Sequence, residues 1–302
     1  MRKGILSIVI WGVLIGNCLA QDGDNSFLFM LTGPGSRASA MGEAFTAVGG
    51  DAGAPYFNPA NAAGFNATEF SLMHVSYLSD ATLEHFAVLT RKRSFRFGVG
   101  LYLGKTANFE RRSGTPTDEP LGTFDEHNFT GSVFWAVPLC QRLGIGSSFK
   151  WAYQKLDIED AHAFAADLGA IYELSSAAII GAAVRNLGTK PKFISESFDL
   201  PREFRVGASY DFKTNPQSNG LLLASDFILT NWGDKSYRLN VGGEYLYQNL
   251  VWLRTGYSFG YESRGFSVGG GLCYLKYKFD YSYVPSKHNL SDMHRFTLRL
   301  QL

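Results

Sequence analysis

From about Asn66 to the C-terminus, the sequence alternates apolar and polar residues with a period of two. Across residues 204–213, for example, the even positions are Phe, Val, Ala, Tyr and Phe, and the odd positions are Arg, Gly, Ser, Asp and Lys. Successive side chains of a strand point to opposite faces, so this period predicts strands with one apolar and one polar face. The expected fold is therefore all-β.

The lengths of the alternating segments distinguish a membrane barrel from a soluble sandwich. Most segments span about 9–13 residues, whereas strands of soluble proteins cluster near ~5–6 residues and membrane strands need ~9–11. Tyrosines near many strand ends, Tyr102 among them, are typical of the aromatic girdle of a membrane barrel. Fourteen strands are predicted, at residues 66–78, 83–91, 95–104, 128–137, 142–153, 162–173, 176–186, 202–213, 219–230, 235–247, 250–259, 264–273, 275–284 and 292–302.

The connections between these segments alternate in length. Every second connection is short, such as 92–94 and 248–249, and the longest ones, 105–127 and 187–201, fall among the others. An even-stranded outer-membrane barrel has short periplasmic turns and longer loops outside the cell. We therefore predict a transmembrane antiparallel β-barrel of about 14 strands over residues 66–302. Its apolar face would meet lipid and its polar face would line the lumen.

The N-terminus predicts export. Two basic residues precede an apolar run at 5–15, and small residues end the segment at Ala20. This pattern is typical of a secretory signal peptide, here residues 1–20. A lipoprotein anchored through Cys18 is the weaker alternative, because Asn17 replaces the small residue expected before a lipidated cysteine. We expect the mature chain in the bacterial outer membrane, with outer-membrane lipid around it.

Several functional classes lack support in the sequence. With 28 Lys plus Arg against 27 Asp plus Glu, the net charge of +1 offers no basic surface for nucleic acid. Residues 256–260 match the GxSxG pattern of serine hydrolases, but they lie on a predicted strand rather than at the strand-to-helix turn that this chemistry needs. The six His show no metal-ligand spacing, and Cys140 and Cys273 are expected as isolated thiols rather than a disulfide. We predict a protein that is not an enzyme and has no cofactor or metal.

Residues 21–65 do not follow the period of two. They are rich in Gly, Ala, Asn and Pro but too apolar for a disordered arm, so they predict a hatch packed within or beneath the barrel. Proline fixes its own backbone angle and asparagine bonds to nearby backbone, so Asn-Pro-Ala at 58–60 predicts a tight turn. A structural anchor is favoured over a moving gate. The hatch and gate candidates are Arg37, Met41, Gly42, Asn58, Pro59 and Ala60.

Charged residues recur on the lumen face of the predicted strands. Their signs are mixed, which favours a network of paired charges over the lining of a selective channel, since unpaired buried charge is costly. Arg37 of the hatch is expected to pair with an inward carboxylate, Asp167 or Glu244. The candidates for this network are Asp167, Glu173, Arg205, Arg238, Glu244, Arg254 and Asp280.

Particular motifs resemble a known family. Residues 35–48 read GSRASAMGEAFTAV, and the Asn-Pro-Ala turn follows at 58–60; downstream, 200–207 read LPREFRVG. This order resembles the signature of the PorV/PorQ family, which belongs with the FadL-like outer-membrane barrels. The resemblance implies a fourteen-stranded barrel with an N-terminal hatch.

The same resemblance implies two possible functions. PorV and PorQ act in type IX secretion, so the first expectation is a role in cell-surface export through contact with secretion-system proteins or exported cargo. FadL-like relatives pass hydrophobic small molecules, so the alternative is a channel for such compounds.

Overall fold

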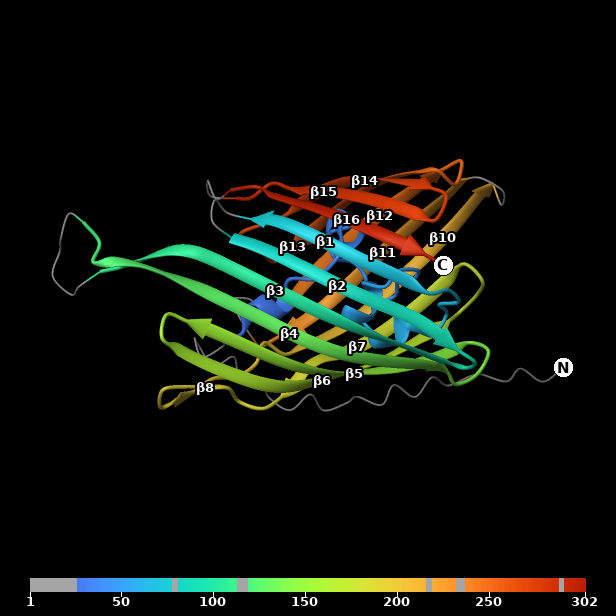
Figure 1. Cartoon of the computed structure of the whole chain (residues 1–302). Coiled ribbons are helices and arrows are strands. Elements are labelled where there is room, and N and C mark those ends of the chain that lie inside the picture. The colour runs from blue at the N-terminus through green and yellow to red at the C-terminus, as the bar shows by residue number, and fades with distance from the viewer. Residues whose placement is uncertain (1–25, 78–80, 113–118, 216–218, 232–236, 288–290) are drawn as a thin grey trace.

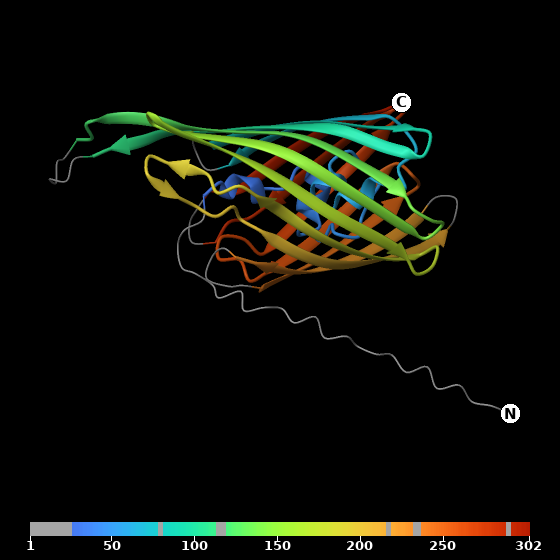
Figure 2. The same cartoon turned by 90° about the horizontal axis from the view of Figure 1, so that it is seen from below.

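The computed structural model describes residues 26–77, 81–112, 119–215, 219–231, 237–287 and 291–302. Within these residues, fourteen strands form one closed antiparallel barrel, as predicted (Figures 1 and 2). Neighbouring strands follow chain order, and β1 (Glu69–Tyr77) pairs with β16 (Met293–Gln301) to close the wall. The other strands of the wall are β2 (Ala81–Lys92), β3 (Phe95–Arg111), β4 (Gly122–Pro138), β5 (Leu143–Leu156), β6 (Glu159–Glu173), β7 (Ala178–Gly188), β10 (Glu203–Asn215), β11 (Asn219–Thr230), β12 (Tyr237–Tyr247), β13 (Val251–Phe259), β14 (Phe266–Tyr274) and β15 (Tyr277–Val284). A small separate hairpin, β8 (Lys192–Phe193) and β9 (Glu196–Ser197), lies in the connection between β7 and β10.

The long loop predicted at 105–127 is mostly strand, so this part of the prediction is wrong. The ends of β3 and β4 continue as a paired hairpin that projects beyond the other strands (Figure 1). Its phenylalanines Phe109 and Phe124 stack with their ring centroids 5.5 Å apart. A register shift just before Phe109 interrupts the alternation of faces, which is why the period of two does not reveal the extension.

The exposed and buried faces of the wall are those of a membrane barrel. On β10, Phe204 and Val206 are each 43% exposed, while Arg205 between them is 2% exposed. A soluble barrel would bury its apolar face instead, so the apolar side chains here form the surface that lipid covers. Tyr102 does not belong to the predicted girdle. It is 6% exposed, because the even positions of β3 point into the lumen.

Residues 26–65, which we call the hatch, fold into short helices and turns inside the barrel (Figure 2). The turn at Asn58 forms through its side chain, whose Oδ1 accepts a hydrogen bond from the Ala60 N–H at 3.0 Å. None of the helices in the described part of the chain is long and apolar enough to cross a membrane. The predicted signal peptide lies outside the described residues. The hatch helices are η1 (Leu28–Leu31), α1 (Ser36–Ala40), η2 (Ala54–Tyr56) and η3 (Pro59–Ala62).

Glycines on the wall let the hatch backbone approach closely. A Cβ atom placed on Gly256 would lie 2.3 Å from the Gly42 nitrogen, and one on Gly242 would lie 2.3 Å from the Met41 oxygen. Gly42 itself has a φ of +63°, a conformation that glycine adopts without strain. The hatch therefore sits in direct backbone contact with β12 and β13.

Candidate functional site

The first attachment of the hatch to the wall is an ion-pair chain that starts at Arg37 of α1. Its Nε and Nη2 donate to the two carboxylate oxygens of Glu244, each at 2.8 Å, and its Nη1 donates to Asp51 at 3.0 Å. Of the two predicted partners, Glu244 is the one that Arg37 contacts. Arg254 continues the chain, because it donates to Glu244 and to Asp280, each at 2.6 Å. Burial by itself raises the pKa of Asp51, but the charges of Arg37 and Arg299 and the hydrogen bonds from Arg37 and Gly53 together outweigh burial, so the pKa is lowered.

The second attachment centres on Glu43, which follows Gly42 in the hatch. Arg264, in the loop after β13, donates to both oxygens of Glu43, at 2.8 and 2.7 Å. Arg295 of β16 lies 3.7 Å away, and Arg205 of β10 donates to the Glu43 backbone oxygen at 2.8 Å. Burial opposes the charge on Glu43, but these arginines, Arg264 foremost, lower its pKa to about 2. The carboxylate therefore joins the loop after β13 to β16, and β10 holds the backbone of the same residue.

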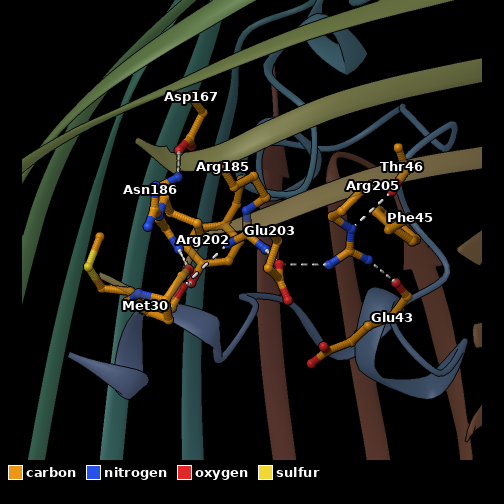
Figure 3. A network of polar contacts seen from close by, with 12 residues as sticks. Met30, Glu43, Phe45, Thr46, Asp167, Arg185, Asn186, Arg202, Glu203 and Arg205 are labelled. Carbon is orange, nitrogen blue, oxygen red and sulfur yellow. Dashed lines mark hydrogen bonds and ion pairs between the residues drawn. The ribbon is translucent and has the colours of Figure 1, made fainter. Parts of the chain in front are cut away.

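A third group of buried charges joins the hatch to β5, β6, β7, β10 and β11; Figure 3 shows its members on β6, β7 and β10. Asp226 accepts hydrogen bonds from the Phe45 N–H at 2.9 Å, from the Thr46 hydroxyl at 2.6 Å and from Arg205 at 2.9 Å. Arg205 also contacts Glu203, 3.4 Å away (Figure 3). Each charge in this group thus has an opposite charge or a hatch N–H within reach, as expected for a network rather than a bare channel lining.

The same group continues along the wall. Glu203 accepts from Arg185 at 2.7 Å, and Asp167 forms an ion pair with Lys150 at 2.7 Å. The Asn186 N–H donates to the second oxygen of Asp167 at 2.8 Å (Figure 3). The buried charges therefore extend around much of the lumen.

Two predicted network residues remain. Arg238 borders the second attachment, because the Tyr261 ring lies 4.5 Å from its guanidinium carbon and 4.3 Å from that of Arg264. Glu173 occupies an odd position of β6, as the inward-facing residues of this strand do, but it is the last residue of the strand and is exposed. Its prediction as a lumen charge is wrong, because the parity of a strand does not show where the buried part of the lumen ends.

The predicted hatch residues lie against the wall. Gly42 donates from its N–H to the Ser267 hydroxyl at 3.1 Å, and its oxygen accepts from Ser258 at 3.0 Å. The serine of the GxSxG pattern therefore binds the hatch. Asn58 donates to the Thr46 oxygen at 2.8 Å and to the Ala170 oxygen of β6 at 3.2 Å. Met41, Pro59 and Ala60 pack on wall glycines at 242, 256 and 146.

Sequence reasoning missed about half of these charges. Glu43, Lys150, Arg185, Glu203, Asp226 and Arg264 all belong to the attachments. Four of them have the inward parity of their strands, which is the signal that could have found them. Glu43 and Arg264 lie outside strands, so the alternation says nothing about them.

A cavity of about 510 Å³ lies above the hatch, at the end of the barrel where β1 leads into β2. Apolar side chains from the hatch and the wall, including Phe29, Leu83 and Tyr102, line one part of it. Lys105, Glu126, Gln154, Arg264 and Arg295 line the rest. This volume falls within the range of small-molecule sites, which combine an apolar lining with a few polar groups.

In the part of the chain that the structure describes, no group of three His, Cys, Asp or Glu side chains could hold a metal ion. Cys140 and Cys273 are both free thiols.

Comparisons with known proteins agree with the barrel fold. The toluene transporter TodX of Pseudomonas putida superposes with a TM-score of 0.65 and 15% sequence identity, over 89% of this chain and 97% of that chain. A FadL homologue of Pseudomonas aeruginosa superposes with a TM-score of 0.55 and 10% identity, over 89% of this chain and 98% of that chain. At such identities the likeness concerns the fold. No curated protein sequence matches the chain.

A family comparison based on sequence covers more than half of the chain. The model described as "Uncharacterised protein family (UPF0164)" matches residues 17–188 of the 302. The chain belongs to this family, UPF0164.

Proposed function

We propose that the protein is an outer-membrane channel that admits small hydrophobic molecules through the cavity above the hatch. The cavity carries this proposal, because it is about 510 Å³ in volume, mixes aromatic and aliphatic walls with a few polar groups, and lies at the long-loop end of the barrel. The likeness in fold to a toluene transporter supports the same reading.

The apolar outer face of the wall and the signal peptide predicted at the N-terminus support location in the outer membrane. The role is not enzymatic. A hydrophobic molecule would enter between Leu83, Tyr102 and Phe29, and the hatch would form the floor of its site. Arg37, Met41, Gly42, Asn58, Pro59 and Ala60 hold that floor to the wall, and the ion pairs of the lumen set how easily it shifts.

Native mass spectrometry of protein released gently from its own membrane tests this proposal. We expect a small hydrophobic mass to remain bound to the wild-type barrel. Ala81 lines the cavity, so Ala81→Trp should place an indole ring in it and displace the bound mass. The control Ala178→Trp adds the same side chain at the opposite end of the wall and should retain it. A wild-type barrel without any small bound mass, or retention in Ala81→Trp, contradicts the proposal.

A second candidate is the export role that the PorV/PorQ resemblance implies. Two exposed side chains at neighbouring hairpins favour it. Leu121, just before β4, is 66% exposed, and Ile158, in the turn between β5 and β6, is 78% exposed. Such side chains suit contact with a protein at the cell surface. A protein bound in stoichiometric amount to the wild type, and lost from Leu121→Asn/Ile158→Asn, would favour export over passage of small molecules.

A further inference from the structure

The hatch is held unevenly around the barrel. Its hydrogen bonds and ion pairs gather on the side formed by β10–β16, where Glu244, Asp226 and Ser267 are among its partners. On the opposite side the hydrogen bonds are fewer: Arg96 of β3 donates to the Phe65 oxygen at 3.0 Å, and none in the described residues joins the hatch to β2, β4 or β5. There the hatch packs on wall alanines such as Ala87 and Ala136, and Ala60 lies against Gly146 of β5.

Two small cavities lie on this side, where Met30, Ala52, Pro55 and Tyr56 of the hatch face the wall. Each has a volume of about 20 Å³, enough for one water molecule. His85, Ser132 and Lys150 line both. The hydroxyl oxygen of Thr130, which lines the upper cavity, is buried without a hydrogen-bond partner. A water in the upper cavity would satisfy it, so this interface is suited to hydration.

Two tyrosines connect these cavities with the large one above. Tyr102 lines both the large cavity and the upper small one. Tyr56 of the hatch lines both small cavities. The Tyr56 hydroxyl donates to the Met30 oxygen, and the Tyr102 ring lies 5.7 Å from the ring of Phe29. The two rings thus separate three spaces that follow one another along the wall.

We propose that the route past the hatch runs along this seam between the hatch and β2–β5, and that Tyr102 and Tyr56 gate it. The inference rests on the proposed channel function and adds its path. The hatch tilts about its attachments on β10–β16, and the seam widens where small side chains and single waters separate the two surfaces. Substrates that pass the gate are then limited in width to about one aromatic ring, since Tyr102 must move aside by its own width.

Single cysteines test the seam in cells whose outer leaflet is lipopolysaccharide. With Cys140→Ser and Cys273→Ser as background, Ser132→Cys places a thiol in the seam, and Ser267→Cys places one on the firmly held side. A small charged methanethiosulfonate added outside the cells should modify Ser132→Cys at least about tenfold faster than Ser267→Cys. Adding Tyr102→Ala should speed the first reaction and leave the second unchanged. Thr130→Cys provides a second probe of the seam if Ser132→Cys folds poorly.

A bulky maleimide on the same thiol tests passage. Uptake of the apolar dye N-phenyl-1-naphthylamine should be slower through labelled Ser132→Cys than through the same variant without the label. Equal labelling rates for Ser132→Cys and Ser267→Cys would overturn the proposed seam. Dye uptake that the maleimide leaves unchanged would also overturn it, and would place the route through the barrel wall. Failure of the channel itself is distinguishable: no version of the protein would then raise dye uptake, whereas the labelling rates would still decide whether the seam opens.

Discussion

The attachment of the hatch through Arg37 makes a quantitative prediction. Arg37→Met removes both bonds to Glu244 and the bond to Asp51. The two side chains of the main pair are 14% and 8% exposed, so the pair counts as buried, and removing one partner of a buried pair costs about 3–5 kcal/mol. Because Glu244 keeps Arg254 at 2.6 Å, we expect the lower end, about 3 kcal/mol.

Urea unfolding of the refolded barrel, followed by tryptophan fluorescence, measures this cost. Lys190→Met is the matched control, because Lys190 is 65% exposed and pairs with Asp199 at 3.2 Å, and such surface pairs contribute about 0–1 kcal/mol. The double variant Arg37→Met/Glu244→Gln should be more stable than the sum of the single changes predicts, by at least about 1 kcal/mol. A cost for Arg37→Met no larger than that of Lys190→Met would refute the reasoning, and additive single changes would show that the two residues do not act together.

Three further predictions concern the hatch charge, its close packing and the lipid face. The pKa of Glu43 is lowered from its ordinary 4.5 to about 2, so its contribution of about 3 kcal/mol is complete above pH 4.5 and is lost as the pH falls toward 2; acid titration of unfolding should be flatter for Glu43→Gln than for wild type. Gly256→Ala should push the hatch from the wall and expose it to trypsin, whereas Gly131→Ala, whose nearest neighbour lies 3.5 Å from the added Cβ, should stay protected. Leu101→Arg places a charge on the lipid face and should reduce the stability of the folded barrel in bilayers by about 2–4 kcal/mol, as measured by urea titration in liposomes.

The wall of the barrel could be predicted from the sequence because each strand shows its two faces locally. Over residues 204–212, the apolar side chains form the outer face and the alternating positions face the hatch or charged groups. The strand can therefore be recognised from its own sequence, without knowledge of distant contacts. The extension of β3 and β4 could not be predicted in this way. Beyond the register shift at Phe109, the hairpin residues are exposed or half-buried on both faces, so nothing there enforces alternation.

The candidate site was predictable only in part, because its residues come together through closure of the barrel. Arg37 and Glu244 could be paired as charges of opposite sign, yet Glu43 and Arg264 lie 221 positions apart and neither belongs to a strand. The inward placement of Tyr102 depends on the register of β3 rather than on its type, since tyrosine suits both a girdle and a lumen wall. Cavities, finally, depend on how the hatch packs, which no local pattern records.

The central claim is that the outer cavity admits hydrophobic molecules to a plugged membrane barrel. The most direct measurement is the initial rate of N-phenyl-1-naphthylamine uptake by cells with a lipopolysaccharide outer leaflet, at matched surface levels of each variant. Cells that carry the wild type should take up the dye faster than cells without the protein, and Ala81→Trp should return the rate to that background while Ala178→Trp should not. A wild-type rate equal to the background would contradict the claim.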